Sequence, residues 1–538
     1  MPHRSAKVLG FAAFALTASC STWDDLGPTP PEGPAEAPRT TAKPSAEAAA
    51  SPSASASGGP IVPVPPVPWA RESIHPVRWT VPTDTTGLNE SVRIDESRDG
   101  GATWTTVGYA PMAERYFRYK VPADGPAVTR VAIVFRTFDG RGNEIVVRRD
   151  EGPDVTLTPS KRKSYTWTRV AENAPFGPRD GAGGVVHAGK MWLIGGWNSN
   201  RFPLSTGNDV WSSADGASWT LEKPNTFVSP STFDHANDWE GRHFAGYHTF
   251  GGRMWIVGGD PIQGYYQTDV WSSTDGKAWT RTDAYQPKLP YTSVDTDPLS
   301  ATFGQTLYDD TVRPREETSF GKRTLALTGV FQGALFVMGG QRIEQFVNAS
   351  VGGAAKAFDD VWRSTDGASF AQVPTAGAIF SPRALVSEVV EHGGRMWVVG
   401  GGLYDDPTAG RPSRSYFNDV WTSPDGAAWE KVPSEAPFAP RIWHNVKELD
   451  DRVWVLCGYD GGELGQGRIA DNLGDAWYTS NGTDWYDAPP PPDFVPRHAA
   501  TTWVHGGSLY VGAGNAMRAE PDGSSTWIAD VWKVTPTP

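Results

Sequence analysis

Short hydrophobic segments with alternating polar positions occur along most of this chain, and turns rich in glycine and aspartate separate them. Residues 67–158 hold several examples, such as Ser91-Val-Arg-Ile-Asp-Glu-Ser and Val131-Ala-Ile-Val-Phe-Arg-Thr. A period of two residues is typical of half-buried strands, and this spacing of strands and turns favours two packed sheets. We therefore predict a small β-sandwich over residues 67–158, with a role as a spacer.

Residues 161–538 contain one pattern six times. Each copy starts with Arg, reaches a Gly-Gly-like pair after a hydrophobic strand, and continues to an Asp-Val-Trp-like unit. Five copies then turn at Asp-Gly or Asn-Gly and place an aromatic residue soon afterwards. Each copy supplies four short strands, which predicts one blade of a β-propeller. The six arginines are Arg179, Arg242, Arg323, Arg383, Arg441 and Arg497, and the six aspartates are Asp209, Asp269, Asp360, Asp419, Asp475 and Asp530.

These repeats resemble the Kelch family of β-propellers, to which galactose oxidase-like proteins are also similar. In that family a double glycine closes the second strand, and spaced aromatic residues pack between blades. The resemblance covers about 70 % of the chain. It implies an all-β fold, a six-bladed Kelch-type β-propeller preceded by a small sandwich that looks like an immunoglobulin-like or fibronectin type III module. The scaffold hosts enzymes, adaptors and carbohydrate binders, so it does not select a function.

The two ends of the repeat region are expected to meet. The sixth copy ends directly after its third strand, while Trp167 precedes Arg179 by the same 12 residues that separate Trp485 from Arg497. We therefore predict that a strand at 164–170 completes the last blade and removes an unpaired sheet edge.

The N-terminal residues indicate export and anchoring. Residues 1–20 have a basic start, an apolar run from Val8 to Leu16, and an ending at Cys20 that resembles a bacterial lipobox. Leu16 lies four residues before Cys20 rather than three, so cleavage and secretion without a lipid is the alternative. Residues 21–66 are rich in Pro, Ala and Ser, which predicts a disordered tether. We expect a lipoprotein of the bacterial cell envelope, in the outer membrane and facing the periplasm or the exterior, which contacts the membrane through its lipid anchor only.

The amino-acid composition restricts the classes of partner that we expect for this protein. The net charge of −13 disfavours nucleic acid, and two cysteines cannot form a disulfide framework. No ligand spacing typical of a metal site occurs, and the pairs Asp309-Asp310 and Asp405-Asp406 are interpreted as solvated turns. We expect a monomer without cofactor or metal.

Strand parity separates the two faces of the predicted disc. Connections between strands two and three, and from strand four to the next strand one, emerge on one face, here called the loop face. Their lengths vary strongly between copies, whereas the hairpins of the opposite face barely vary, so we expect a binding site on the loop face, mainly through residues 280–322. The six arginines start the innermost strands there and could hold a carboxylate or phosphate. The alternative is a structural ring of Arg–Asp ion pairs.

Less repetitive residues of the loop face are more selective candidates for binding. A Trp or Tyr beside Arg or His suits stacking on a sugar or an aromatic ligand. These candidates are His243, Trp443, His444, His498, Trp197, Trp239, Tyr265 and Tyr266.

Enzyme functions rank below binding. Radical-copper chemistry needs a Cys crosslinked to a Tyr, whereas Cys457 replaces a strand-ending Gly. The turns that look like sialidase Asp-boxes are hairpin devices. A sialic-acid epimerase of the Kelch type is the best alternative, with an Arg as anion holder and His243, His444 or Glu463 as proton carrier. Our sequence-based hypothesis is a non-catalytic propeller that binds a protein or glycan; the alternative is a sugar-acid epimerase, mutarotase or other carbohydrate-active propeller enzyme.

Overall fold

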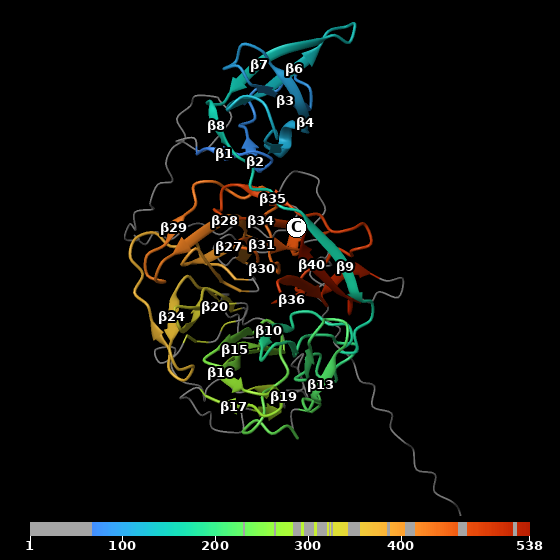
Figure 1. Cartoon of the computed structure of the whole chain (residues 1–538), viewed down its shortest axis with the longest axis vertical. Coiled ribbons are helices and arrows are strands. Elements are labelled where there is room, and N and C mark those ends of the chain that lie inside the picture. The colour runs from blue at the N-terminus through green and yellow to red at the C-terminus, as the bar shows by residue number, and fades with distance from the viewer. Residues whose placement is uncertain are drawn as a thin grey trace, which may run out of the picture.

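The described part of the chain is all-β (Figure 1). Besides strands, it contains one short 3₁₀ turn, η2 (Met112–Glu114). No helix in this part is both long and apolar enough to cross a bilayer. The computed structural model describes residues 67–537, apart from 230–231, 263–264, 283–291, 295–305, 309–319, 322, 324–325, 343–355, 385–387, 404–414, 461–470 and 520–524.

Six antiparallel arrays of four strands form the repeat region, as far as it is described. In the first five arrays the four strands follow chain order. The first sheet is β10 (Gly183–His187), β11 (Lys190–Ile194), β12 (Val210–Ser213) and β13 (Thr220–Lys223), and the second is β14 (Gly246–Phe250), β15 (Arg253–Ile262), β16 (Tyr265–Ser273) and β17 (Thr280–Arg281). The third is β20 (Leu327–Phe331), β21 (Ala334–Met338), β24 (Val361–Ser364) and β25 (Ala371–Gln372), and the fourth is β26 (Val390–His392), β27 (Arg395–Leu403), β28 (Ser415–Ser423) and β29 (Glu430–Lys431). The fifth is β30 (Asn445–Glu448), β31 (Val453–Leu456), β34 (Ala476–Thr479) and β35 (Trp485–Asp487), and the sixth is β36 (Thr501–His505), β37 (Ser508–Gly512), β40 (Val531–Pro536) and β9 (Tyr165–Ala171).

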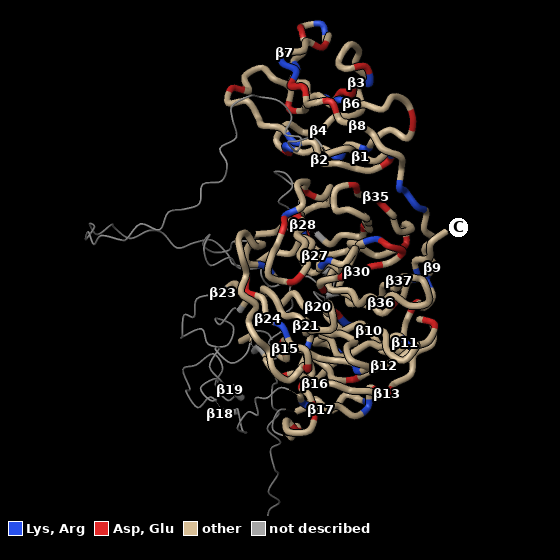
Figure 2. Tube along the Cα trace, turned by 60° about the vertical axis from the view of Figure 1, so that its left-hand side comes forward, with Lys and Arg blue, Asp and Glu red and all other residues tan. Residues whose placement is uncertain are grey.

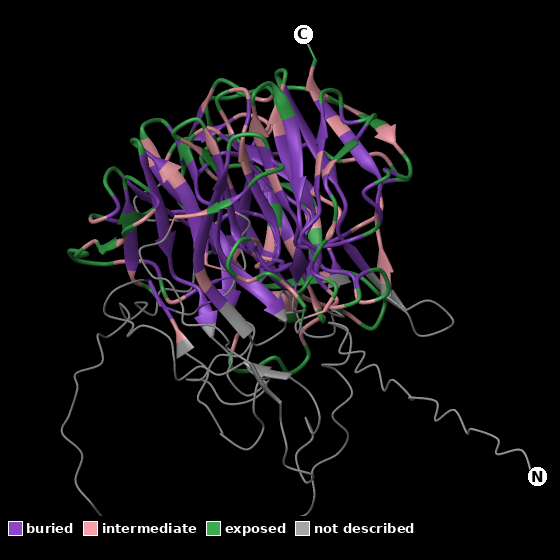
Figure 3. Cartoon of the chain, turned by 90° about the horizontal axis from the view of Figure 1, so that it is seen from below, coloured by how far each residue is buried: buried purple, intermediate pink, exposed green. Residues whose placement is uncertain are grey.

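The first strands of the six sheets surround a central channel. Each first strand contacts that of the next sheet, and β36 of the sixth sheet contacts β10 of the first. This closed order fits a β-propeller. Figure 3 shows the buried strands crossing the disc, with many of the exposed turns gathered on one side.

The two ends of the repeat region pair with each other. Strand β9 lies antiparallel to β40, with Trp167 opposite Val534 and Thr168 opposite Lys533. The strand expected at 164–170 is therefore present, and it supplies the outer strand of the sixth sheet.

Turn glycines explain how neighbouring sheets pack. Gly276 has a φ of 72°, and a Cβ at this position would lie only 2.2 Å from the ring of Trp192 in the preceding sheet. Gly367 has the same relation to Trp255, at 2.1 Å. The Gly that follows each turn Asp therefore permits a left-handed conformation and also leaves room for the aromatic ring of the preceding sheet.

The N-terminal domain has two sheets around one core. One sheet has the order β1 (Trp69–Ala70), β8 (Val155–Thr158), β6 (Val128–Phe138), β3 (Ser91–Ser97) and β4 (Thr105–Pro111), with β7 (Glu144–Glu151) paired to β6. The other pairs β2 (Ile74–Arg78) with β5 (Tyr116–Lys120). Val77 and Tyr119 from the second pack with Ile94 and Ile133 from the first. Figure 2 shows that Lys, Arg, Asp and Glu are denser on this domain than on most of the ring.

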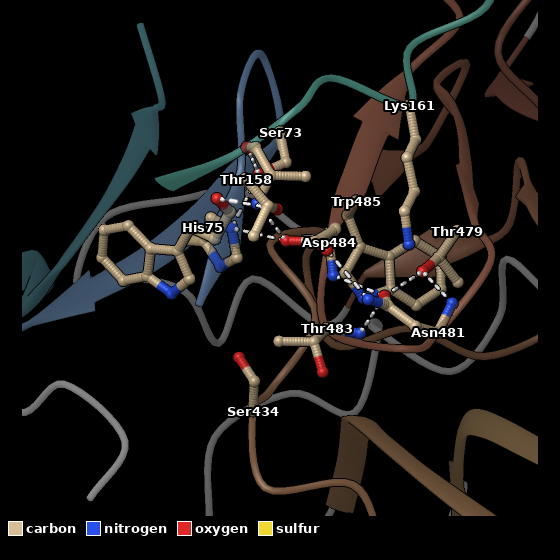
Figure 4. A network of polar contacts seen from close by, with 12 residues as sticks. Ser73, His75, Thr158, Lys161, Ser434, Thr479, Asn481, Thr483, Asp484 and Trp485 are labelled. Atoms are coloured by element: carbon tan, nitrogen blue, oxygen red, sulfur yellow. Dashed lines mark hydrogen bonds and ion pairs between the residues drawn. The ribbon is translucent and has the colours of Figure 1, made fainter. Parts of the chain in front are cut away.

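The N-terminal domain is joined to the fifth sheet. Ile74 of β2 pairs with Trp485 of β35, so β2 and β5 extend that sheet. The Ala70 N–H donates to Asp484 Oδ1 at 2.8 Å, and His75 Nε2 lies 3.4 Å from the same oxygen (Figure 4). Tyr116 and Arg118 both donate to the carbonyl of Pro437. The domain that we predicted as a spacer is therefore fixed against the ring.

Asp484 is expected to hold this junction. The variant Asp484→Ala leaves the buried Ala70 N–H without its acceptor, at a cost of about 1–3 kcal/mol, and removes the carboxylate beside His75, whose Nε2 keeps its contact of 2.8 Å with Ser73 Oγ. Limited proteolysis between β8 and β9 should become faster than in the wild type. Asp493→Ala is the control, because Asp493 pairs at 3.6 Å with Arg169, which lies outside the cleaved segment, in an exposed position where an ion pair contributes about 0–1 kcal/mol. Equal cleavage rates for the two variants would contradict this assignment.

Candidate functional site

The six arginines of the repeat are held inside their own sheets. Arg179 Nη1 donates to the carbonyl of Gly195 at 2.8 Å and to Asp209 Oδ1 at 2.7 Å, while its Nη2 donates to Asp209 Oδ2 at 2.9 Å. At most 2 % of each arginine side chain is exposed. The same bonds connect Arg242 with Asp269, Arg323 with Asp360, Arg383 with Asp419, Arg441 with Asp475 and Arg497 with Asp530.

The third-strand Trp completes each unit. Trp271 Nε1 donates to Asp269 Oδ2 at 2.7 Å, and the equivalent bond occurs in the other five sheets. Burial acts to raise the pKa of Asp269, but the charge and hydrogen bonds of Arg242 outweigh it and lower the pKa to about 2. The Arg–Asp pairing that the sequence allowed is present in all six sheets, and it uses the guanidinium donors that an anionic ligand would need.

The double glycine links each sheet to the next. The carbonyl of its first residue accepts the arginine bond, and the N–H of its second residue donates to the carbonyl of the next copy's arginine, as from Gly196 to Arg242 at 2.9 Å and from Gly514 to Arg179 at 2.7 Å. Both residues have positive φ angles, and Cys457 and Ala513 adopt the same conformation where they replace the first Gly. The repeated Arg, Gly and Asp positions therefore build the ring.

Three candidate histidines are buried just below the loop face. His243 Nδ1 donates to the carbonyl of Asp260 at 3.0 Å, His444 Nε2 to that of Val399 at 2.9 Å, and His498 Nδ1 to Asn472 Oδ1 at 2.8 Å. Burial lowers the pKa of His243 to about 4 and, as the main cause, those of His444 and His498 to about 3. These imidazoles are neutral near pH 7 and are bonded within the scaffold.

The candidate tryptophans pack against other aromatic rings of the scaffold. Trp443 stacks on Phe244 with ring centres 6.4 Å apart and lies 4.8 Å from His498, and Trp197 lies 4.8 Å from His243. Trp443 and Trp197 are each 8 % exposed, and Trp239 is fully buried beside Trp279. Tyr265 and Tyr266 belong to β16, but their side chains lie outside the described residues, as does most of 280–322.

A series of backbone hydrogen bonds connects sheets at the mouth of the channel, and it was not predicted from the sequence. The residue two positions after the arginine has a positive φ in each of the four sheets where it is described, at Gly181, Phe244, Trp443 and Ala499. The Phe244 N–H donates to Gly181 O at 3.0 Å, the Gly181 N–H to Ala499 O at 2.9 Å, and the Ala499 N–H to Trp443 O at 2.8 Å. These bonds connect the second, first, sixth and fifth sheets around the mouth.

Accessible charge lies deeper, inside the channel. A cavity there is lined by residues of the first strands, among them Tyr247, Asn445 and Thr502. Lys447 Nζ and Glu388 Oε1, which also line it, form an ion pair of 2.8 Å with 12 % and 19 % of their side chains exposed. Sequence reasoning missed both residues. The available signal was Lys447 on a first strand, because the register places Val, His, Gly, Val and Trp at the equivalent positions of the other sheets.

Reactive groups nominated from the sequence are buried or outside the described residues. Burial is the main cause that raises the pKa of Cys457 to about 12, so this thiol stays protonated. Glu463 and the pairs Asp309-Asp310 and Asp405-Asp406 lie outside the described residues.

Comparisons with known proteins show a distant structural likeness. No family model matches the chain, and no curated protein matches it. Among solved structures, that of the protein YjhT shares 13 % sequence identity and a TM-score of 0.45 with this chain. The match covers 69 % of this chain and 100 % of that one.

Proposed function

We propose that this chain is a six-bladed, Kelch-type propeller that works as a binding module and takes a protein or a glycan on its loop face. The observation that carries this proposal is an additional two-stranded ribbon or a sheet extension between the second and third strands of five sheets. These connections emerge on one face because successive strands are antiparallel. Rigid scaffolds commonly bind through such irregular segments.

The extensions differ from sheet to sheet. In the second sheet β15 and β16 continue to the pair Ile262 and Tyr265, and in the fourth β27 and β28 continue to Leu403 and Ser415. The others carry separate ribbons, formed by β22 (Gln341–Arg342) with β23 (Lys356–Ala357), β32 (Tyr459–Asp460) with β33 (Asp471–Asn472), and β38 (Asn515–Ala519) with β39 (Ser525–Trp527). By contrast, the turns of the hairpin face repeat one bonding scheme, as in Asp215 and Asp275, which both accept two N–H groups of their own turn.

The state of the candidate acid–base groups favours binding over catalysis. General acid–base catalysis needs a group that reaches the substrate and titrates near the working pH. His243 and His444 are buried, bonded to carbonyls, and have strongly lowered pKa values. The sugar-acid epimerase therefore ranks second, and within the described residues Glu388 and Lys447 are the channel groups that it would use.

The remaining parts of the proposal concern location. We place the head at the bacterial cell envelope, attached through a lipid on Cys20 and the tether of residues 21–66, with the N-terminal domain as an immunoglobulin-like or fibronectin type III module. Secretion without a lipid is the alternative, and conversion of Cys20 to Ser with membrane fractionation distinguishes the two.

Shortening the connections of the loop face is expected to weaken binding. Two full-chain variants, one shortened within 283–319 and one within 343–355, are compared with wild type on a glycan array and in pull-downs. We expect at least one variant to lose about tenfold or more in affinity for whichever ligand the wild type binds. The control replaces Gly251-Gly252 on the hairpin face with Asn-Gly, which suits their positive φ angles. Unchanged binding by both shortened variants would refute the site, and sugar-acid turnover lost in Glu388→Gln would favour the enzyme.

A further inference from the structure

Three histidines share one position and one hydrogen bond on the hairpin face. His187, His392 and His505 each end the first strand of a sheet. Their Nε2 atoms lie 3.0, 3.1 and 3.2 Å from the carbonyl oxygens of Thr274, Ser480 and Ala214, which belong to the turn of the following sheet. A carbonyl only accepts, so Nε2 carries the proton and a neutral ring has its lone pair on Nδ1.

His392 differs from the other two in what faces Nδ1. Glu448 Oε1 lies 3.9 Å and Asp451 Oδ1 3.7 Å from this nitrogen, and the three ligand atoms all lie within 4.8 Å of one another. The His392 side chain is 7 % exposed, whereas that of Asp451 is 93 % exposed. Among the described residues, no other group of three His, Cys, Asp or Glu side chains gathers in this way.

The arrangement lacks a positive charge at its centre. A lone pair on Nδ1 and two carboxylates converge, and no Lys or Arg among the described residues forms an ion pair with Glu448 or Asp451. Such a group is stable if the ring takes up a second proton or if a cation sits between the three atoms. The Ser480 carbonyl bond is the kind of outer contact that orients a metal-binding imidazole.

We propose that His392, Glu448 and Asp451 bind one divalent transition-metal ion, with Zn²⁺ as the reference ion, between the fourth and fifth sheets. One imidazole nitrogen and two carboxylates suit Zn²⁺ or Mn²⁺, whereas Mg²⁺ and Ca²⁺ take oxygen ligands. Ligand atoms about 2.1 Å from zinc lie roughly 3.4 Å apart, so the site needs only a modest contraction. Exposed Asp451, in the turn between β30 and β31, can supply it by rotation, and water fills the open positions. The ion would tie the β26–β27 hairpin to the β30–β31 hairpin.

Metal titration of the intact protein tests the proposal. The full chain, without a histidine tag and stripped with a chelator, is titrated calorimetrically with Zn²⁺ and Mn²⁺, and with Ca²⁺ for comparison. We expect one Zn²⁺ per chain and a rise in melting temperature with Zn²⁺ concentration, as mass action requires for an ion that binds only the folded state. Co²⁺ should give the visible absorption bands of a bound ion with a nitrogen ligand.

The ligand variants separate a metal site from a charged histidine. Glu448→Gln and Asp451→Asn keep the fold, because both side chains are partly or fully exposed, and each should weaken Zn²⁺ binding by about tenfold or more. His392→Gln should abolish binding, while His187→Gln, which loses the same carbonyl bond at a site without carboxylates, should bind like wild type. Absence of saturable Zn²⁺ binding, or binding unchanged by Glu448→Gln and Asp451→Asn, overturns the proposal and leaves an imidazolium ion pair. Neither result bears on ligand binding at the loop face.

Discussion

The variant Asp269→Ala is expected to lower the free energy of unfolding by about 3–5 kcal/mol, the cost of breaking a buried ion pair by removing one partner. Arg242, which is fully buried, keeps its charge in the variant but loses its carboxylate, and the Trp271 indole loses its acceptor. Urea unfolding followed by tryptophan fluorescence measures the loss.

The matched control comes from the same sheet. Asp275 accepts the N–H groups of Lys277 and Ala278 at 2.9 and 3.0 Å in an exposed turn. Asp275→Ala should therefore cost only about 1 kcal/mol, because water replaces the lost acceptor. If the two variants were equally stable, the Arg–Asp–Trp unit would not be the structural element described above.

The loss caused by Asp269→Ala is expected to depend on pH. Because Arg242 lowers the pKa of Asp269 to about 2, below the value of about 3.9 in an unfolded chain, the folded state favours the charged carboxylate. The stabilisation is therefore complete above about pH 4 and is lost as the pH falls through 2. The difference between wild type and variant should shrink over this range. Buried His243, His444 and His498 destabilise both proteins equally in acid, so the difference isolates the aspartate.

The ring of sheets could be predicted from the sequence because the interactions that build it stay within one repeat or join neighbouring repeats. Arg179 bonds to Gly195 and Asp209, 16 and 30 residues further along the chain. The interval from Arg to the first Gly-like residue is 16 or 17 in every copy, whereas the interval from Arg to Asp ranges from 27 to 37 with the length of the loop between them. A residue type that returns at such intervals reveals the contact that requires it. The pairing of β9 with β40 also followed, since the missing strand and the unused strand had matching intervals.

The candidate site could be predicted less well, because the exposure of a side chain depends on residues from other repeats. Trp443 follows an arginine in the sequence and suits a ligand platform, but Phe244 and His498 from other sheets cover its faces. The channel pair of Glu388 and Lys447 joins two sheets, and no single repeat displays it. The contact of Ala70 with Asp484 spans 414 residues and leaves no periodic signal. Repeated residues therefore identify the contacts that build the scaffold, while the solvent-accessible polar groups lie at positions that do not repeat.

Ring closure provides the last test, because the pairing of β9 with β40 joins the two ends of the repeat region within one sheet. Thr168 of β9 faces Lys533 of β40, and neither is fully buried. Unfolding of the ring therefore separates two strands that are more than three hundred residues apart in sequence. A covalent link between them should oppose that separation by restricting the unfolded chain.

The double variant Thr168→Cys/Lys533→Cys is expected to gain about 3–5 kcal/mol of stability when oxidised, since a disulfide that closes so long a loop removes much entropy from the unfolded state. Directly opposed residues of antiparallel strands have Cβ atoms about 4.5–5.5 Å apart, close to the separation of a disulfide. Melting temperatures with and without reductant measure the gain. The single variants are the controls, with Cys20→Ser in all the variants, because buried Cys457 then offers neither single cysteine a partner. A disulfide that forms without raising the melting temperature would contradict this expectation and would show that the link strains the folded sixth sheet as much as it restricts the unfolded chain.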